Sequence, residues 1–245
     1  MDIISFSISG SFAAFKDPSV TSHQTVSFIP SKSAIIGIIG AIIGTKRTNS
    51  LAELYNPEYL ELYKNTMIGL RFESDPKKVI YFTNHRSLKE TKTKPIKSEL
   101  VDSPKYTIFV SSDKNTMANL KNSIQQNKFS FSPYLGHAYC PCVVSDLQFY
   151  QDVVESDAKK NDTSCVILDE SEIYSNPFKI ELSGKDDNSH VIIERHLHHF
   201  FLDDKFQSRI LKHWIPVKSI FTVNKSLEPK LSKFVKICDE IVCLY

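Results

Sequence analysis

The most apolar segment of the chain limits what the chain can fold into. It runs from Ser31 to Arg47 as SKSAIIGIIGAIIGTKR and carries three of the seven glycines. Its uncharged part extends only from Ser33 to Thr45, whereas a helix needs about 20 consecutive apolar residues to cross a bilayer. The segment is therefore predicted to be a helix buried in a core. The N-terminus MDIISFSISG lacks the features of a signal peptide, so we expect a soluble cytoplasmic protein without membrane contact.

Composition indicates a folded chain with reduced cysteines and without a strong overall positive charge. With 245 residues and 41% hydrophobic residues, the chain can build one large domain or two small ones. Its five cysteines include no C-x-x-C pair, which indicates reduced thiols. Cys140 and Cys142 are expected to be packing thiols, because no second pair stands at zinc spacing. A net charge of +2 does not mark a strongly basic protein, so any nucleic-acid surface must be a local patch.

The order of predicted elements indicates an α+β fold. Ile4, Phe6 and Ile8 alternate with serines, which predicts a strand over residues 2–9. After the apolar helix we expect a polar helix over 51–63 with Pro57 inside it, strands over 67–73, 106–111 and 142–151, and a helix over 115–127 capped by Asn115. This β-α-β-β-α-β order is that of a ferredoxin-like or RNA-recognition domain, with two helices on one face of an antiparallel sheet. The other face should be free for a ligand.

The domain boundary is predicted near residue 151. Residues 1–151 would form the ferredoxin-like domain, and residues 152–245 a smaller β-rich C-terminal subdomain. The second part contains the short strand-like runs SCVILD, FKIEL, HVIIERHLHHFFL and SIFTVN.

The apolar helix has readable ends and a distinct face. Ser31 or Ser33 is a suitable N-cap after Pro30. Gly37, Gly40 and Gly44 share one helical face, which predicts close approach of the helix to a sheet. Unpaired N–H groups at a helix start also favour an anion, so Ser31, Lys32 and Ser33 are a candidate phosphate site.

Positive charge is concentrated between residues 76 and 105. This segment carries eight lysines and arginines and three acidic residues, a net charge of +5. VIYF and KSEL can pair as the legs of a hairpin inserted at about 75–104, with His85 and Arg86 near its tip. A run of charge is often only a solvated face. A projecting hairpin would also place its cations where they can contact phosphates.

The loop FSPYLGHAYCPC, residues 129–142, gathers aromatic rings between glycine and prolines. Such rings can stack on single-stranded bases, and by composition alone a packed loop is the other interpretation. His23, His85 and His137 lie in loops, but no catalytic partner can be assigned to them. His190, His196, His198, His199 and His213 form no recognisable metal motif, so we expect no metal and no cofactor.

Four segments together resemble the CRISPR-associated Cas-five family of the RAMP superfamily. They are SGSFAAF after the first strand, the helix entry VSFIPSKSAIIGIIGAIIG, the basic insertion before SPKYTIFV, and SPYLGHAYCPC before the fourth strand. The match covers roughly residues 1–150 and looks most like subtype I-B. The glycine-rich loop common near the C-terminus of RAMP proteins has only Gly184 to represent it.

The resemblance implies a non-catalytic RNA-binding role in antiviral defence. Family members grip the 5′ handle of the CRISPR RNA (crRNA) in the Cascade complex. They contact the backbone subunit (Cas-seven) and the large subunit (Cas-eight), near target DNA, with the processing nuclease (Cas-six) as a further candidate neighbour. Their inserted hairpin is called the thumb. Carried onto this chain, the resemblance assigns RNA binding to Lys16, His23, Ser31, Lys32, Ser33, His85, Arg86, Lys89, Lys92, Lys94, Tyr134, Gly136 and His137.

Two alternatives compete with this role. Subtype I-C members cut precursor crRNA without metal, using a Tyr, a Lys and a His, and here His23 or His137 could supply the histidine. No matching set can be placed from the sequence, so no catalysis is expected. The third hypothesis is an unrelated ferredoxin-like module that binds proteins.

Overall fold

The computed structural model describes most of the chain as a mixed α/β protein with few helices and mainly antiparallel sheets. The described residues are 1–17, 24–46, 56–86, 92–156, 162–163, 165–175, 179–183, 189–202, 205–217, 220–223 and 232–245. The elements of the first part are β1 (Ile3–Ser9), β2 (Phe12–Ala13), α1 (Lys32–Ile43), α2 (Pro57–Asn65), β3 (Met67–Phe72), β4 (Lys77–Arg86), β5 (Thr93–Asp102), β6 (Lys105–Ser111), α3 (Lys114–Gln125) and β7 (Val143–Tyr150). Those of the second part are β8 (Asp162–Thr163), β9 (Val166–Asp169), α4 (Glu170–Ser175), β10 (Ile180–Ser183), β11 (His190–Leu202), β12 (Lys205–Val217), β13 (Ile220–Val223), β14 (Lys233–Ile237) and β15 (Glu240–Leu244).

A four-stranded antiparallel sheet in the order β3-β6-β1-β7 forms the centre of the first part. Ile4, Phe6 and Ile8 of β1 are fully buried on one face, because alternate residues of a strand point to the same side. Phe6 lies opposite Ile108 of β6, so neighbouring strands extend the same apolar surface. The four predicted strands are confirmed. The helix predicted over 115–127 is also present, but its N-cap is Asp113, whose carboxylate accepts from two backbone N–H groups.

Helix α1 buries its apolar side chains in the same core as this face of the sheet. Five of its six isoleucines are buried, namely Ile35, Ile36, Ile38, Ile39 and Ile42, and Ile43 is partly buried. Ser31 caps the helix as predicted, and Gly44 ends it with a left-handed φ of 87°. The predicted role of the glycines is wrong, because Gly37 is exposed with nothing near it and Gly40 faces Thr45 and Leu62, not the sheet. Among the described residues, no helix is long and apolar enough to span a membrane.

Helix α2 begins later than predicted. Pro57 is its first residue, and Asn56 caps it by accepting from the N–H of Glu58. Proline has no N–H to contribute and its φ already suits a helix, so it fits the first turn and not the interior. Residues 51–55 of the predicted helix lie outside the described residues.

The second face of the central sheet is not free, contrary to expectation. Strands β14 and β15 pack across one end of it, and form a second apolar cluster with Ile3 and Phe109. Gly69 of β3 permits this approach, since a Cβ there would lie 2.9 Å from the Cys243 carbonyl oxygen. Only the other end of this face is left for polar side chains.

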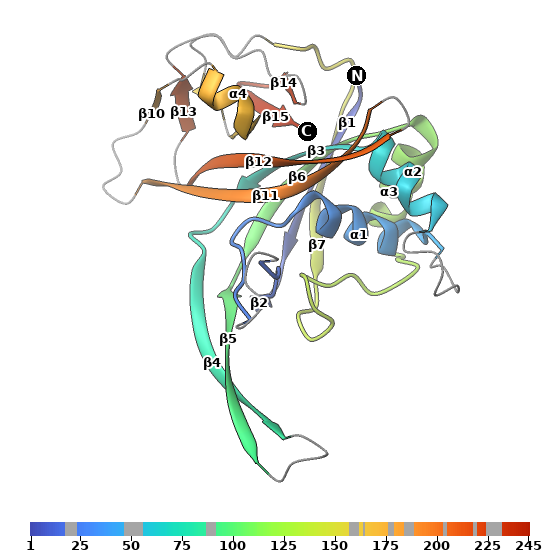
Figure 1. Ribbon diagram of the computed structural model, residues 1–245. Coiled ribbons are helices and arrows are strands. Elements are labelled where there is room, and N and C mark those ends of the chain that lie inside the picture. Colours follow the sequence, from blue (N-terminus) through green and yellow to red (C-terminus); the bar gives the residue numbers. More distant parts are fainter. Residues whose placement is uncertain are drawn as a thin grey trace.

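Strands β4 and β5 form a long hairpin that extends away from the rest of the molecule (Figure 1). Val79–Phe82 pair with Lys97–Leu100, as predicted from VIYF and KSEL. A two-stranded hairpin alone is only marginally stable. Its base gains support from β2, which pairs with β5, and from Gln24, which bonds to the backbone N–H of Glu99.

The second part of the chain is rich in strands, as predicted, but shares a core with the first part. Strands β11 and β12 pair along thirteen residues each, and β9 pairs with β12. Trp214, Ile215 and Tyr245 belong to the same buried cluster as Phe6 and Ile39. The division into two domains stays a prediction.

Gly69→Ala should destabilise the protein by roughly 1–3 kcal/mol, because a methyl group would meet a backbone carbonyl that cannot move alone. Gly37→Ala is the matched control, since nothing lies within 4 Å of its added Cβ. In a helix this change should raise stability by about 0.5–1 kcal/mol. Urea unfolding of both variants measures the difference, and equal effects would contradict the packing of β15 on β3.

Candidate nucleic-acid interface

The outer half of the β4–β5 hairpin presents exposed cations. Arg86, Lys92 and Lys94 are exposed, and Arg86 lies opposite Thr93. Within the described part of the chain, no carboxylate lies within ion-pair distance of these three side chains. At the base, by contrast, Lys78 lies 3.4 Å from Glu99 and 4.9 Å from the centre of the Phe28 ring. The charges at the outer end are therefore the ones available to an external anion.

The structure does not describe the side chains of three predicted RNA-binding residues, Lys89, His23 and His85. Lys89 lies outside the described residues, as does His23 of the preceding loop. The backbone of His85 is part of β4 and pairs with Lys94. Their proposed contacts with RNA stay predictions.

The loop from Phe129 to Cys142 combines a fixed backbone with exposed rings. Leu135 is fully buried, and its carbonyl accepts from the N–H of Ala14 at 2.8 Å. Gly136 has a left-handed φ of 85°, and a Cβ there would lie only 2.3 Å from the Ala14 carbonyl oxygen. Tyr134 is 49% exposed and Tyr139 is 53% exposed. The backbone of the loop is thus packed, whereas its aromatic side chains are exposed. The structure therefore has features of both interpretations made from the sequence, a packed loop and a loop with rings available for stacking.

A cavity of about 380 Å³ lies where this loop meets the base of the hairpin. Its lining comes from three segments: Ala14, Lys16, Gln24, Thr25, Val26, Tyr81, Thr83, Glu99, His137 and Tyr139. The rings of His137 and Tyr139 stack with centres 4.0 Å apart, and the hydroxyls of Tyr139 and Tyr81 lie 3.3 Å apart. Burial, followed by the hydrogen bond with Tyr81, raises the pKa of Tyr139 to about 12. Tyr139 is therefore neutral at physiological pH.

The structure brings Lys16 and His137 into this cavity, as two of the predicted RNA-binding residues. It also adds Tyr139, one of the rings of the predicted aromatic loop, and residues that the sequence did not single out, namely Gln24, Thr25, Tyr81 and Glu99. Their only common signal was proximity to the predicted hairpin and aromatic loop. The pairing of β4 with β5 was predictable, but not the packing of the hairpin base against residues 14–16 and 24–26.

The start of α1 differs from the prediction at Lys32. Ser31 and Ser33 lie at the surface end of the helix, with their hydroxyl oxygens 2.9 Å apart. Lys32 is 7% exposed, and its amine donates to the Tyr245 carbonyl at 3.2 Å. The reason is its helical position, three and four residues before the buried Ile35 and Ile36. Burial lowers the pKa of Lys32 to about 7, so this side chain is part of the core and not an open phosphate contact.

The C-terminal histidines form a buried cluster instead of a surface site. His196 and His198 share the inner face of β11, and the ring of His196 lies 4.7 Å from that of His213 on β12. His198 Nδ1 lies 3.1 Å from the Tyr63 hydroxyl. No group of three metal-binding side chains with suitable geometry occurs among the described residues. His190 lies apart, 3.5 Å from Asp75.

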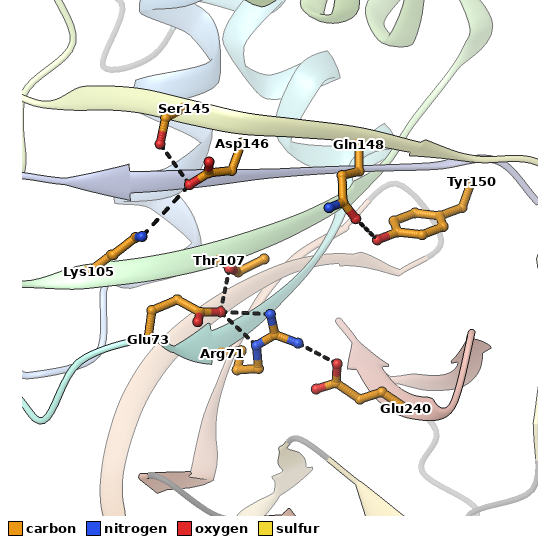
Figure 2. A network of polar contacts seen from close by, with 9 residues as sticks. All are labelled: Arg71, Glu73, Lys105, Thr107, Ser145, Asp146, Gln148, Tyr150 and Glu240. Atoms are coloured by element: carbon orange, nitrogen blue, oxygen red, sulfur yellow. Dashed lines mark hydrogen bonds and ion pairs between the residues drawn. The ribbon is translucent and has the colours of Figure 1, made fainter.

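The uncovered end of the second sheet face carries a polar network, shown in Figure 2. Arg71 forms ion pairs with both Glu73 and Glu240, and Thr107 donates to Glu73 at 2.6 Å. Burial acts to lower the pKa of Arg71, but the two carboxylates outweigh it and raise the pKa. The guanidinium is therefore already neutralised by its neighbours.

Charge at this face does not suit an RNA backbone. A cavity of about 500 Å³ lies there, with Asp146, Asp239 and Glu240 in its lining. Lys105 is engaged as well, at 3.8 Å from Asp146. An excess of carboxylates repels phosphates. The exposed cations and rings lie on the hairpin and the aromatic loop instead.

Comparison with known proteins identifies the family. The family model described as CRISPR-associated protein (Cas_Cas5) matches residues 3–201. The chain belongs to the CRISPR-associated Cas5 (Cas-five) family. This match extends about fifty residues beyond the part that carried the sequence resemblance, into β11.

Solved structures match this Cas-five chain at low sequence identity. A crystal structure of a CRISPR protein from Archaeoglobus fulgidus is 12% identical, with a TM-score of 0.51 and 99% of each chain covered. A chain of a CRISPR RNA-guided surveillance complex is also 12% identical, with a TM-score of 0.49 and coverage of 94% of this chain and 95% of the other. No curated protein matches the chain.

The buried histidines predict a loss of stability at acidic pH. Burial, with repulsion by His196 and His198, lowers the pKa of His213 well below 6.5. Protonation therefore favours the unfolded chain, and stability should fall as the pH drops below about 6.5, by up to roughly 1.4 kcal/mol per pH unit for this one group. His213→Phe should give a flatter dependence. Urea unfolding at pH 5.5, 6.5 and 7.5 tests this, and equal slopes for both proteins would contradict it.

Proposed function

We propose that this Cas-five protein is a non-catalytic subunit of a type I CRISPR surveillance complex and binds the 5′ handle of crRNA. The observation that carries the proposal is the separation of charge on the molecule. Exposed cations and aromatic rings occupy the hairpin and the loop, whereas the open end of the second sheet face is rich in carboxylates. Single-stranded RNA needs both phosphate contacts and stacking surfaces, and both occur on the hairpin and loop.

The arrangement of elements supports a finer description of the fold. The strand order β3-β6-β1-β7, with α1 after β1 and α3 after β6, is that of a ferredoxin-like domain. The β4–β5 hairpin is inserted between two strands of this sheet and corresponds to the thumb. Its length and exposure suit insertion between neighbouring molecules.

The protein would act within a larger assembly. We place the crRNA handle along the thumb base and the aromatic loop, with the Cas-seven backbone subunit and the Cas-eight large subunit as protein neighbours and target DNA nearby. The form of the α1 entry and of the PYLGH loop favours subtype I-B. In that subtype a separate nuclease, Cas-six, makes the cut.

Lys92→Glu with Lys94→Glu should weaken binding of a CRISPR-repeat RNA at least tenfold at low salt, because each reversal removes a cation and adds a repulsive charge. Lys114→Glu with Lys128→Glu is the control, because both residues are exposed near the ends of α3 and give the same change in net charge. Fluorescence anisotropy across a salt series measures both variants. The slope of log affinity against log salt should fall by about 0.7 for each phosphate that the protein no longer neutralises.

Equal weakening by the two pairs would contradict a localised contact at the thumb. It would show that only overall charge matters. If RNA fails to bind the wild-type protein under low salt and also in the assembled complex, the third hypothesis, a protein-binding module, takes its place.

One observation favours metal-independent RNA cleavage as a second candidate function. Lys16, Tyr139 and His137 line the same cavity, and these are the residue types that the cutting branch of the family uses. Incubation of labelled repeat RNA with the protein in EDTA tests the idea. A discrete cut that is lost in His137→Ala would establish cleavage, whereas RNA that is bound but intact after long incubation would exclude it.

A further inference from the structure

A carboxylate from the second part of the chain holds the backbone of the first part. Glu194 of β11 accepts from the backbone N–H of Phe28 at 2.7 Å through one oxygen and from that of Ile29 at 2.9 Å through the other. Phe28 and Ile29 lie outside helices and strands, just before Pro30 and the start of α1. Backbone N–H groups in such a segment need an acceptor. Here a side chain about 165 residues further along the chain supplies it.

The register of β11 places Glu194 for this contact. Glu194 lies between the buried Ile192 and His196 on the inner face of the strand, opposite the buried His213. Its side chain is only 17% exposed, and Oε2 lies 3.3 Å from His196 Nε2. Burial of a carboxylate is costly unless hydrogen bonds compensate for it, and bonds to a charged acceptor are among the stronger ones. The two bonds to the backbone are therefore a firm attachment between β11 and the segment before α1.

The attached segment, residues 24–29, contacts both strands at the base of the thumb. The Gln24 carbonyl accepts from the N–H of Glu99 on β5 at 2.9 Å. The amine of Lys78 on β4 lies 4.9 Å from the centre of the Phe28 ring. A displacement of this segment would therefore also displace the base of the thumb.

The same segment positions a cation that is predicted to bind RNA. Lys16 pairs with Val26 in an isolated β-bridge, and the N–H of Ser27 donates to the Phe15 carbonyl at 2.8 Å. Lys16 is exposed and lines the cavity at the thumb base. Lys16 and the thumb base thus depend on one stretch of backbone, which Glu194 holds from behind.

We propose that Glu194 is a positioning residue of the RNA-binding surface, which fixes the thumb base and Lys16 relative to α1 without touching RNA. Its side chain is nearly enclosed, both of its oxygens are engaged, and a carboxylate repels phosphates. The inference rests on the proposed function. It extends that function to β11, although every residue predicted from the sequence to bind RNA precedes residue 138.

Hydrogen exchange on the full-length protein tests the contact itself. Glu194→Gln leaves one acceptor oxygen and turns a donor toward the other backbone N–H, so the amide of Phe28 or Ile29 should exchange roughly tenfold faster. Asp239→Asn removes the same charge from an exposed site on the second face of the central sheet and should leave both amides unchanged. Unchanged exchange in Glu194→Gln would overturn the proposal.

Fluorescence anisotropy with a labelled CRISPR-repeat RNA tests the consequence, on the protein alone and co-expressed with its complex. Loss of one negative charge should by itself tighten binding to a polyanion, and Asp239→Asn measures that effect alone. Glu194→Gln should instead weaken binding by about tenfold. The salt slope should stay that of the wild type, because no phosphate contact is lost.

Two further variants separate positioning from a general loss of stability. Gly69→Ala is expected to destabilise the contact of β3 with β15, which does not include residues 24–29, and should retain wild-type affinity. Tyr106→Phe removes the hydroxyl that donates to the Phe28 carbonyl at 2.7 Å, and so loosens the same segment at a second point. It should weaken binding with an unchanged salt slope, and it carries the test if Glu194→Gln does not fold.

The proposal is overturned if Glu194→Gln binds RNA as tightly as the wild type or more tightly. It is also overturned if Gly69→Ala weakens binding as much as Glu194→Gln does. In both cases the wild-type protein still binds RNA, so the proposed function stands. If the wild-type protein binds no RNA even in the complex, the proposed function fails and this inference fails with it.

Discussion

The shared core of the α1 isoleucines and the apolar face of the central sheet is the constraint on which the rest of the structure depends. It buries five isoleucines of one helix on the alternating apolar residues of the central sheet. Because α1 covers one face of the sheet, β14 and β15 pack on the second face, and the β4–β5 hairpin extends away from the core (Figure 1). The same contact places Lys32 in the interior beside Tyr63 and Tyr245, despite its charge.

Elements with a clear periodicity were predictable from the sequence. The strand with Ile4, Phe6 and Ile8 shows alternation, and the VIYF and KSEL legs have complementary lengths around a polar tip. Strands β12, β14 and β15 were not predicted. Each of them pairs with a neighbour in the chain, β12 with β11 and β14 with β15. Nothing local in KFVKI or EIVCL, however, indicates that these two strands cover Ile3 and Phe109.

The site was predictable only in part, for the same reason. Charge and aromatic content located the hairpin and the loop, which are local features. The cavity between them depends on the close fit of Gly136 against Ala14 and on the bond of Gln24 to β5. Such contacts join segments about 75 to 120 residues apart, so spacing along the chain carries no sign of them. The prediction for Lys32 failed for a different reason. A lysine next to a helix N-cap is expected to be exposed, but the position of Lys32 on the helix places it on the buried face.

The most direct test of the proposed RNA path is ultraviolet crosslinking of crRNA to the protein in its assembled complex, with the crosslinked peptides identified by mass spectrometry. We expect crosslinks to Tyr81, Tyr134 or Tyr139 and to peptides of the β4–β5 hairpin, where rings and exposed cations occur together. Crosslinks confined to the carboxylate-rich sheet face, for example to Tyr150, would contradict this path.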